Sequence, residues 1–241
     1  MIKSLIVAAY VIIMLILSIP YLLIIKLCKF LGLKKVYSTL LNSFLIFFCR
    51  SAFWLAGVKV EVEGLENLLD RNMIFVGNHQ SMVDIPVMLG YIPGIKGFIA
   101  KKETKKLPII NWWMEEINCV FLDRHNIRQG MKDMAKAKGL LEEGKSLVIY
   151  PEGTRSKSDQ MGEFKKGSLK IGVQAGVPIV PVAISGSYKI FEEERKIKKG
   201  KVKVKIGEPI FIERLSEEEK KDISQLAYER VKGLLEKIQK P

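Results

Sequence analysis

The sequence predicts an α/β fold, a two-layer or three-layer sandwich around a mostly parallel central sheet of about seven strands. Three observations support this prediction. Short apolar runs alternate with helical stretches after residue 57. Two long apolar segments precede them. Polar residues follow several of the short runs directly, where open α/β sheets carry their active groups. We therefore expect a two-helix membrane anchor at residues 1–57 and an α/β domain at residues 58–241.

The composition indicates an anionic partner. The formal net charge is +13, from 39 Lys and Arg against 26 Asp and Glu, and such an excess suits lipid headgroups, an acidic protein or nucleic acid. No nucleic-acid motif is visible and aromatic residues are not interleaved with the basic ones, so nucleic acid is not expected. The three cysteines, Cys28, Cys49 and Cys119, are odd in number and widely spaced. They predict neither a disulfide framework nor a zinc site, and they fit a reducing compartment.

The first apolar segment is long enough to cross a membrane. Residues 5–25 are apolar except at Tyr10, Ser18 and Pro20, and as a helix they match a hydrocarbon core of roughly 30 Å. Lysines cluster just beyond it, at residues 26–35, which favours the cytoplasmic side. A cleaved signal peptide fits poorly, because the apolar run is long and no small-residue cleavage site follows it.

The second apolar segment, residues 37–55, predicts a helix in the membrane interface. Apolar residues recur at helical spacing, and Phe and Trp54 are expected to face lipid. The two segments suggest a hairpin dipped into one leaflet with both ends on the cytoplasmic side. A full span by the first helix is the alternative, and core helices of a soluble domain are a further one.

The remaining chain predicts seven strands separated by helices. The predicted strands are residues 58–62, 73–76, 97–100, 120–122, 146–150, 179–184 and 202–206. The predicted helices are residues 126–143, residues 166–175, and a last helix opened by the capping-box spacing of Ser216 and Glu219. The strict alternation of residues 58–62 indicates an edge or half-buried strand.

His79 and Asp84 follow the second predicted strand. A histidine held by a carboxylate can take a proton from a hydroxyl near neutral pH. Positions five apart on one helix differ by roughly 140° around its axis, so the two meet only if His79 precedes the helix and Asp84 lies in its first turn. Ser81 and Asp84 also have capping-box spacing, but Pro86 favours a helix that begins nearer Asp84. A metal site is less favoured, because no third ligand is spaced nearby.

A second polar stretch follows the fifth predicted strand, as Tyr150-Pro151-Glu152-Gly153-Thr154-Arg155-Ser156. Gly153 allows backbone N–H groups to approach a ligand, and Arg155 can clamp a phosphate with two bonds. A plain turn with a surface arginine is the alternative. Lys101 and Arg124 each follow another predicted strand and are candidates for the same pocket, whereas His125 has no matched carboxylate.

Four blocks in this order resemble the glycerolipid acyltransferase family. They are the His-x-x-x-x-Asp motif from His79 to Asp84, the arginine-ended strand at residues 120–124, the Pro-Glu-Gly-Thr-Arg stretch at residues 150–156, and Val-Pro-Ile-Val-Pro at residues 177–181. The resemblance covers roughly residues 58–208. Cys119 departs from the family, which often has glycine there.

The resemblance implies transfer of an acyl group from a thioester to lysophosphatidate, which gives phosphatidate without an acyl-enzyme. It implies His79 as the base and Asp84 as the residue that holds its tautomer. It further implies that Lys101, Arg124 and Arg155 bind the acceptor phosphate, and that Glu152, Gly153 and Thr154 shape the glycerol site. No metal and no organic cofactor is expected.

The expected partners are lysophosphatidate, acyl carrier protein or acyl-coenzyme A as donor, and anionic membrane lipids. The expected location is the cytoplasmic face of the cell inner membrane. Rival interpretations are the same chemistry on glycerol 3-phosphate, a lysophospholipid or an ornithine lipid, and a non-catalytic lipid-binding protein. The sequence leaves open the acyl-chain length, the choice of donor and the oligomeric state.

Overall fold

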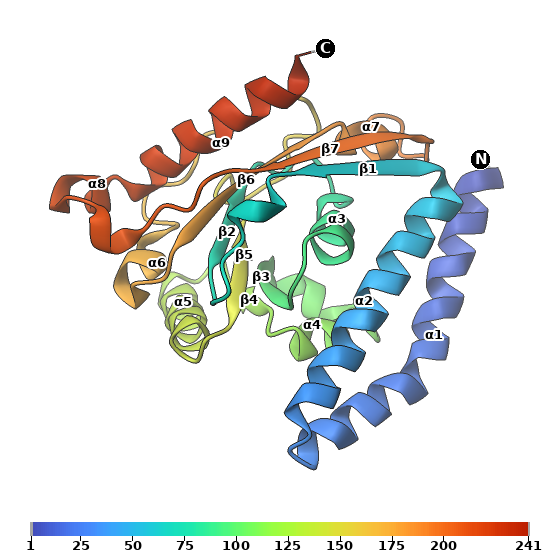
Figure 1. Ribbon diagram of the computed structural model, residues 1–241. Coiled ribbons are helices and arrows are strands. Elements are labelled where there is room, and N and C mark those ends of the chain that lie inside the picture. The colour runs from blue at the N-terminus through green and yellow to red at the C-terminus, as the bar shows by residue number, and fades with distance from the viewer. Residues whose placement is uncertain (1, 241) are drawn as a thin grey trace.

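The computed structural model describes residues 2–240 and places one seven-stranded sheet at the centre of the domain (Figure 1). The strands are β1 (Val58–Glu63), β2 (Ile74–Gly77), β3 (Lys96–Lys101), β4 (Val120–Leu122), β5 (Ser146–Ile149), β6 (Ile179–Ser185) and β7 (Gly200–Ile206). Their order is β1-β7-β6-β2-β5-β3-β4, and every pair is parallel except β6 with β7. The prediction of a mostly parallel sheet of about seven strands is confirmed, with β1 at an edge.

Helices cover both faces of the sheet, so the fold has three layers. On one face lie α5 (Ile127–Glu142), α6 (Lys170–Ala175) and α9 (Ile223–Gln239). On the other lie α3 (Asp84–Tyr91), α4 (Ile110–Glu116), and the hairpin of α1 (Ile2–Phe30) and α2 (Lys34–Ala56). Alternate residues of β2 face the two layers of helices. Ile74 and Val76 pack in the core on the side of α5, α6 and α9, whereas Phe75 packs in the core on the side of α1 to α4. A strand buried on both faces has no polar side, which explains its continuous apolar sequence.

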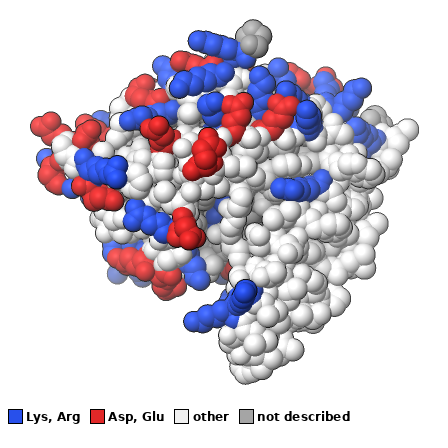
Figure 2. Space-filling model, viewed as in Figure 1, with Lys and Arg blue, Asp and Glu red and all other residues white. Residues whose placement is uncertain are grey.

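The N-terminal hairpin exposes a large apolar surface. Both helices are long and apolar enough, by length and composition, to cross a membrane. Leu17 is 64% exposed, Phe30 86% and Trp54 80%, and Figure 2 shows few charged side chains on the hairpin side of the molecule. Core helices of a soluble domain would bury most of these side chains. The exposed surface therefore fits membrane association.

The hairpin is also bonded to the domain. Trp113 of α4 donates its indole N–H to Ser18 of α1 at 2.9 Å. Arg50 of α2 donates to the carbonyl oxygen of Gly90 in α3 at 2.8 Å. A Cβ at Gly90 would lie 2.8 Å from the Cβ of Cys49, so only glycine permits this approach. The contacts at Gly90 fix α3 against α2, and α3 is the helix that begins with Asp84.

Several helices differ from the prediction. The helix predicted at residues 166–175 begins only at Lys170, because the residues before it form turns. The capping box of Ser216 and Glu219 is confirmed, but it opens a short α8 (Glu217–Lys221), and α9 follows as a separate helix after Asp222. The structure adds α4, α7 (Ser187–Phe191) and three short 3₁₀ helices, Leu65–Asn67, Lys102–Lys106 and Ile212–Arg214. Most of these segments are shorter than two helical turns, so no 3.6-residue period marks them in the sequence.

Candidate active site

Three neighbouring parallel strands end at the same edge of the sheet and supply the site. They are β6, β2 and β5, with β2 in the middle. His79 follows β2, Glu152 follows β5 and Ser187 follows β6. Because the carboxyl ends of parallel strands meet at one edge, residues about 70 to 110 positions apart in the chain become neighbours.

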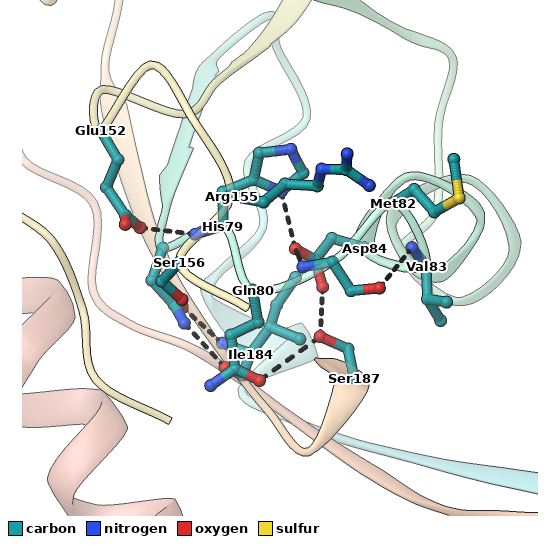
Figure 3. A network of polar contacts seen from close by, with 12 residues as sticks. His79, Gln80, Met82, Val83, Asp84, Glu152, Arg155, Ser156, Ile184 and Ser187 are labelled. Carbon is teal, nitrogen blue, oxygen red and sulfur yellow. Dashed lines mark hydrogen bonds and ion pairs between the residues drawn. The ribbon is translucent and has the colours of Figure 1, made fainter. Parts of the chain in front are cut away.

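His79 and Asp84 form a direct pair, as Figure 3 shows. The Nδ1 atom of His79 lies 2.7 Å from Oδ2 of Asp84. The helix α3 begins at Asp84, with Val83 before it as an N-cap residue that makes no side-chain cap. The predicted geometry is therefore confirmed: His79 precedes the helix and Asp84 lies in its first turn. Ser81 also supports the start of α3: its hydroxyl oxygen accepts the backbone N–H of Val83 at 3.1 Å, and its own backbone N–H donates to Oδ2 of Asp84 at 2.9 Å.

The carboxylate of Asp84 is buried and held on both oxygens. Its exposed fraction is 0%. The hydroxyl of Ser187 donates to Oδ1 of Asp84 at 2.5 Å, while Oδ2 faces His79 and the N–H of Ser81. Buried polar oxygens need such partners, because an unsatisfied one lowers stability. These bonds fix the oxygen that faces the imidazole.

The imidazole of His79 is held in one orientation. Because Nδ1 faces Asp84, Nε2 is the nitrogen available to a substrate. The ring stacks on Tyr150, with centroids 4.1 Å apart and planes 10° apart. Burial raises the pKa of the Tyr150 hydroxyl well above its ordinary value, so Tyr150 is a neutral packing surface. The His79 side chain remains 17% exposed, which gives a substrate access to it.

Glu152 supports the backbone of His79. Its Oε1 accepts the backbone N–H of His79 at 2.6 Å, and its Oε2 accepts the N–H of Gly162 at 3.0 Å. Burial raises the pKa of Glu152, and the two N–H donors oppose this rise. The N–H of Ser156 also donates to the carbonyl oxygen of His79 at 2.8 Å. Both oxygens of Glu152 already accept bonds from backbone N–H groups, so the structure gives Glu152 a supporting role. A contact between Glu152 and substrate stays a prediction.

The loop after Glu152 carries Arg155 and accepts a hydrogen bond from Arg124. Gly153 has φ of +72°, in the left-handed region, and its carbonyl oxygen accepts a bond from Nη1 of Arg124. Thr154 is exposed on the same loop. Arg155 donates from Nη1 to Oε1 of Glu192 at 2.6 Å. Arg155 is therefore part of this loop and Arg124 contacts it, at the edge of the sheet where His79 lies.

Lys101 is held less firmly than these arginines. It ends β3 at the same edge of the sheet, and its Nζ lies 3.8 Å from Oε2 of Glu103 with about half of the side chain exposed. The neighbouring Lys102 pairs with Asp123 at 2.6 Å, and this bond lowers the pKa of Asp123. Phosphate binding by Lys101, Arg124 and Arg155 stays a prediction.

Sequence reasoning missed Ser187, Glu192 and the stacking partner Tyr150. Ser187 ends a Ser-Gly-Ser stretch that begins with the last residue of β6 and resembles an ordinary turn. Glu192 opens a run of charged residues that is typical of a solvated surface. Only the fold places these side chains against residues more than 30 positions away.

Comparison with known proteins identifies the family of this chain. The family model described as Acyltransferase matches residues 59–185. The chain is similar to the protein named 1-acyl-sn-glycerol-3-phosphate acyltransferase BAT2, chloroplastic, from Brassica napus, with 37% identity over 64% of this chain and 45% of that protein. It is also similar to a protein from Mycoplasma pneumoniae named probable 1-acyl-sn-glycerol-3-phosphate acyltransferase, with 34% identity over 70% of this chain and 62% of that protein.

A solved structure is similar over nearly the whole of both chains. The crystal structure of the 1-acyl-sn-glycerophosphate (LPA) acyltransferase PlsC from Thermotoga maritima has a TM-score of 0.85 and 33% identity, and the match covers 100% of this chain and 98% of that one. The matches to the Brassica napus and Mycoplasma pneumoniae proteins cover less of those proteins. This chain spans between two fifths and two thirds of their length.

Proposed function

The chain belongs to the Acyltransferase family, and on this premise we propose that it acylates lysophosphatidate at the sn-2 hydroxyl, using an acyl thioester as donor and forming phosphatidate. The observation that carries the proposal is the His79–Asp84 pair, with 2.7 Å between Nδ1 and Oδ2 and with Nε2 left for substrate. The relatives from Brassica napus and Mycoplasma pneumoniae carry names for this activity, and the Thermotoga maritima structure shares the fold.

His79 acts as the base in this proposal. Nε2 takes the proton of the acceptor hydroxyl as the hydroxyl oxygen attacks the thioester carbonyl carbon. The tetrahedral intermediate collapses, the carbon–sulfur bond breaks, and the thiolate takes the proton from His79. Asp84 keeps the proton of neutral His79 on Nδ1 and stabilises the positive imidazolium between the two transfers. No acyl-enzyme forms, because the hydroxyl attacks the donor directly.

Arg155, Arg124 and Lys101 bind the acceptor phosphate in this proposal, and the loop of Gly153 and Thr154 shapes the glycerol site. Two contacts support this part of the proposal. Arg124 donates to the carbonyl oxygen of Gly153, and Arg155 donates to Glu192, which also accepts the backbone N–H of Met82. Anchoring the phosphate near the base brings the hydroxyl within reach of Nε2, which converts a bimolecular encounter into a positioned one.

The hairpin keeps the enzyme at the source of its acceptor. Exposed apolar side chains on α1 and α2 fit a membrane, and lysines at residues 26–35 favour the cytoplasmic face. We place the protein on the cytoplasmic face of the cell inner membrane, where anionic lipids attract the basic domain. The net charge of +13 also suits an acidic acyl carrier protein, and acyl-coenzyme A is the alternative donor.

The test is thiol release from acyl thioesters over a panel of acceptors. The purified protein in detergent receives acyl-coenzyme A or acyl carrier protein with lysophosphatidate, glycerol 3-phosphate or a lysophospholipid. We expect the largest kcat/KM with lysophosphatidate. A higher value with another acceptor would move the proposal to that acceptor, and no acceptor-dependent thiol release with any of them would leave a lipid-binding protein instead.

A further inference from the structure

Arg155, the proposed phosphate ligand, is already engaged by an acidic side chain. Its Nη1 donates to Oε1 of Glu192 at 2.6 Å. The Glu192 side chain is 6% exposed and that of Arg155 is 34% exposed. Glu192 stands at the end of the short helix α7, just after Phe191. The ion pair therefore joins the buried carboxylate of Glu192, at the end of α7, to the more exposed guanidinium of Arg155, in the loop after β5.

The same oxygen of Glu192 also holds the turn after His79. Oε1 accepts the backbone N–H of Met82 at 3.1 Å and the hydroxyl of Ser81 at 3.3 Å. Figure 3 shows Arg155 on the side of the His79–Asp84 pair where Met82 lies. One carboxylate thus connects the guanidinium of Arg155 to the turn between His79 and Asp84.

This geometry leaves Arg155 free to bind a second anion. A guanidinium has five N–H donors in a rigid plane, and Glu192 accepts from Nη1 alone. The remaining donors suit the oxygens of a phosphate. An arginine with a fixed side chain loses less conformational entropy when it binds than a freely rotating one does. Holding Arg155 in place should therefore strengthen its bond to the acceptor.

We propose that Glu192 is a positioning residue that directs Arg155 toward the phosphate monoester of the acceptor. The proposal rests on the proposed function, because it assigns a phosphate-bearing acceptor to the same site. Glu192 lies beyond the matched family region, which ends at residue 185, and it acts through Arg155 rather than on the reacting atoms. A purely structural role, in which Glu192 only holds the turn of Ser81 and Met82, is the alternative outcome.

A double-mutant cycle separates these roles. The acceptor KM, donor KM and kcat are measured for the wild type, Glu192→Ala, Arg155→Ala and the double variant. We expect Glu192→Ala to raise the acceptor KM about tenfold while kcat changes less than about threefold and the donor KM stays constant. In the Arg155→Ala background the same change should add less than about twofold, since the side chain that it positions is gone.

Two further variants sharpen the cycle. Glu192→Gln keeps an oxygen that can accept from Arg155 and removes only the charge, so its acceptor KM should lie between those of the wild type and Glu192→Ala. It also supplies a folded variant if Glu192→Ala is unstable. Glu193→Ala is the matched control, because Glu193 is the neighbouring acid and its Oε2 lies 3.8 Å from Nζ of Lys198. It should leave all three constants unchanged.

The contrary results are distinct. An unchanged or lower acceptor KM in Glu192→Ala and Glu192→Gln would overturn the proposal, as would a full tenfold rise in the Arg155→Ala background. An unchanged acceptor KM in Arg155→Ala would overturn it as well, since nothing would remain to be positioned. Failure of the proposed function looks different, because the wild type itself would then show no lysophosphatidate-dependent thiol release.

Discussion

The proposed base and the positively charged side chains proposed to bind phosphate are held in different ways. Asp84 is fully buried, and the groups that hold it and His79 come from segments following three neighbouring strands. Lys101, at the end of β3, and Arg124, in the loop after β4, are exposed and lie near a carboxylate and a carbonyl oxygen. Arg155 lies between these extremes, because sheltered Glu192 holds it. If the proposed roles hold, the fold holds the base rigidly, and the side chains proposed to recognise the acceptor are more adaptable.

His79, Asp84 and the groups that hold them form the rigid half of the site. The largest effect should follow from changing this half with Asp84→Asn. The neutral amide no longer stabilises the positive imidazolium of His79, and where its nitrogen faces Nδ1 it donates a hydrogen bond instead of accepting one, which places the proton on Nε2. We expect kcat to fall about 10³- to 10⁴-fold, with the acceptor KM within about threefold of wild type. Initial rates of thiol release measure both. Asp159→Asn, at an exposed position, is the control, and a loss of less than tenfold for Asp84→Asn would count against the pair.

Ser187→Ala tests whether the buried support of Asp84 matters to the reaction. The change removes the hydroxyl bonded to Oδ1 of Asp84, and leaving a buried acceptor without its donor costs about 1–3 kcal/mol. We expect kcat to fall about tenfold with little change in the acceptor KM. The matched control is Ser185→Ala, two residues earlier in β6. Equal kcat values for the two variants would show that Ser187 is not part of the support.

Single losses among the exposed cations should have smaller effects. Arg124→Ala removes a cation that contacts the Gly153 loop, and we expect the acceptor KM to rise about three- to tenfold. Lys101→Ala removes a half-exposed lysine near Glu103, and solvent weakens such charges, so we expect about twofold. Both changes should leave kcat nearly constant. A kcat loss larger than the KM change would place either residue with the rigid half instead.

The smallest effect on activity should come from Lys96, which supports the end of α3. Its Nζ donates to the carbonyl oxygens of Met88, Ile92 and Gly94 at 3.1, 2.8 and 2.7 Å. Burial lowers the pKa of Lys96 from 10.5 to about 7. Between these values the unfolded chain binds a proton that the folded chain does not, so the contribution of Lys96 to stability rises with pH in this window and is lost as pH falls toward 7.

Lys96→Met should remove that pH dependence. Between pH 7 and 9 the wild type should gain on the order of 1–2 kcal/mol of stability relative to the variant. Thermal unfolding in detergent at several pH values measures the difference, with Lys132→Met, on the exposed side of α5, as the control. Parallel pH curves for wild type and Lys96→Met would show that Lys96 does not titrate in this range.

The sequence predicted the parts of the molecule that local patterns determine. Apolar runs and alternating patterns located the seven strands that the structure describes, and Pro86 correctly favoured a helix that begins near Asp84. The contacts of Ser187 and Glu192 could not be predicted, because each depends on how β6 and α7 pack beside a turn about 100 residues earlier. The sequence marked Glu152 as important, yet the direction of its carboxylate toward the backbone of His79 needs the folded loop.

The most direct test of the division between base and cations compares His79→Ala with Arg155→Ala. For each variant, kcat, the acceptor KM and the binding of lysophosphatidate are measured under the same conditions. We predict that His79→Ala lowers kcat at least about 10³-fold and leaves binding largely intact, whereas Arg155→Ala mainly raises the acceptor KM. The other histidine of the chain provides the control His125→Ala, which should behave as wild type. Near wild-type turnover in His79→Ala would contradict the account, because no base would then be assigned.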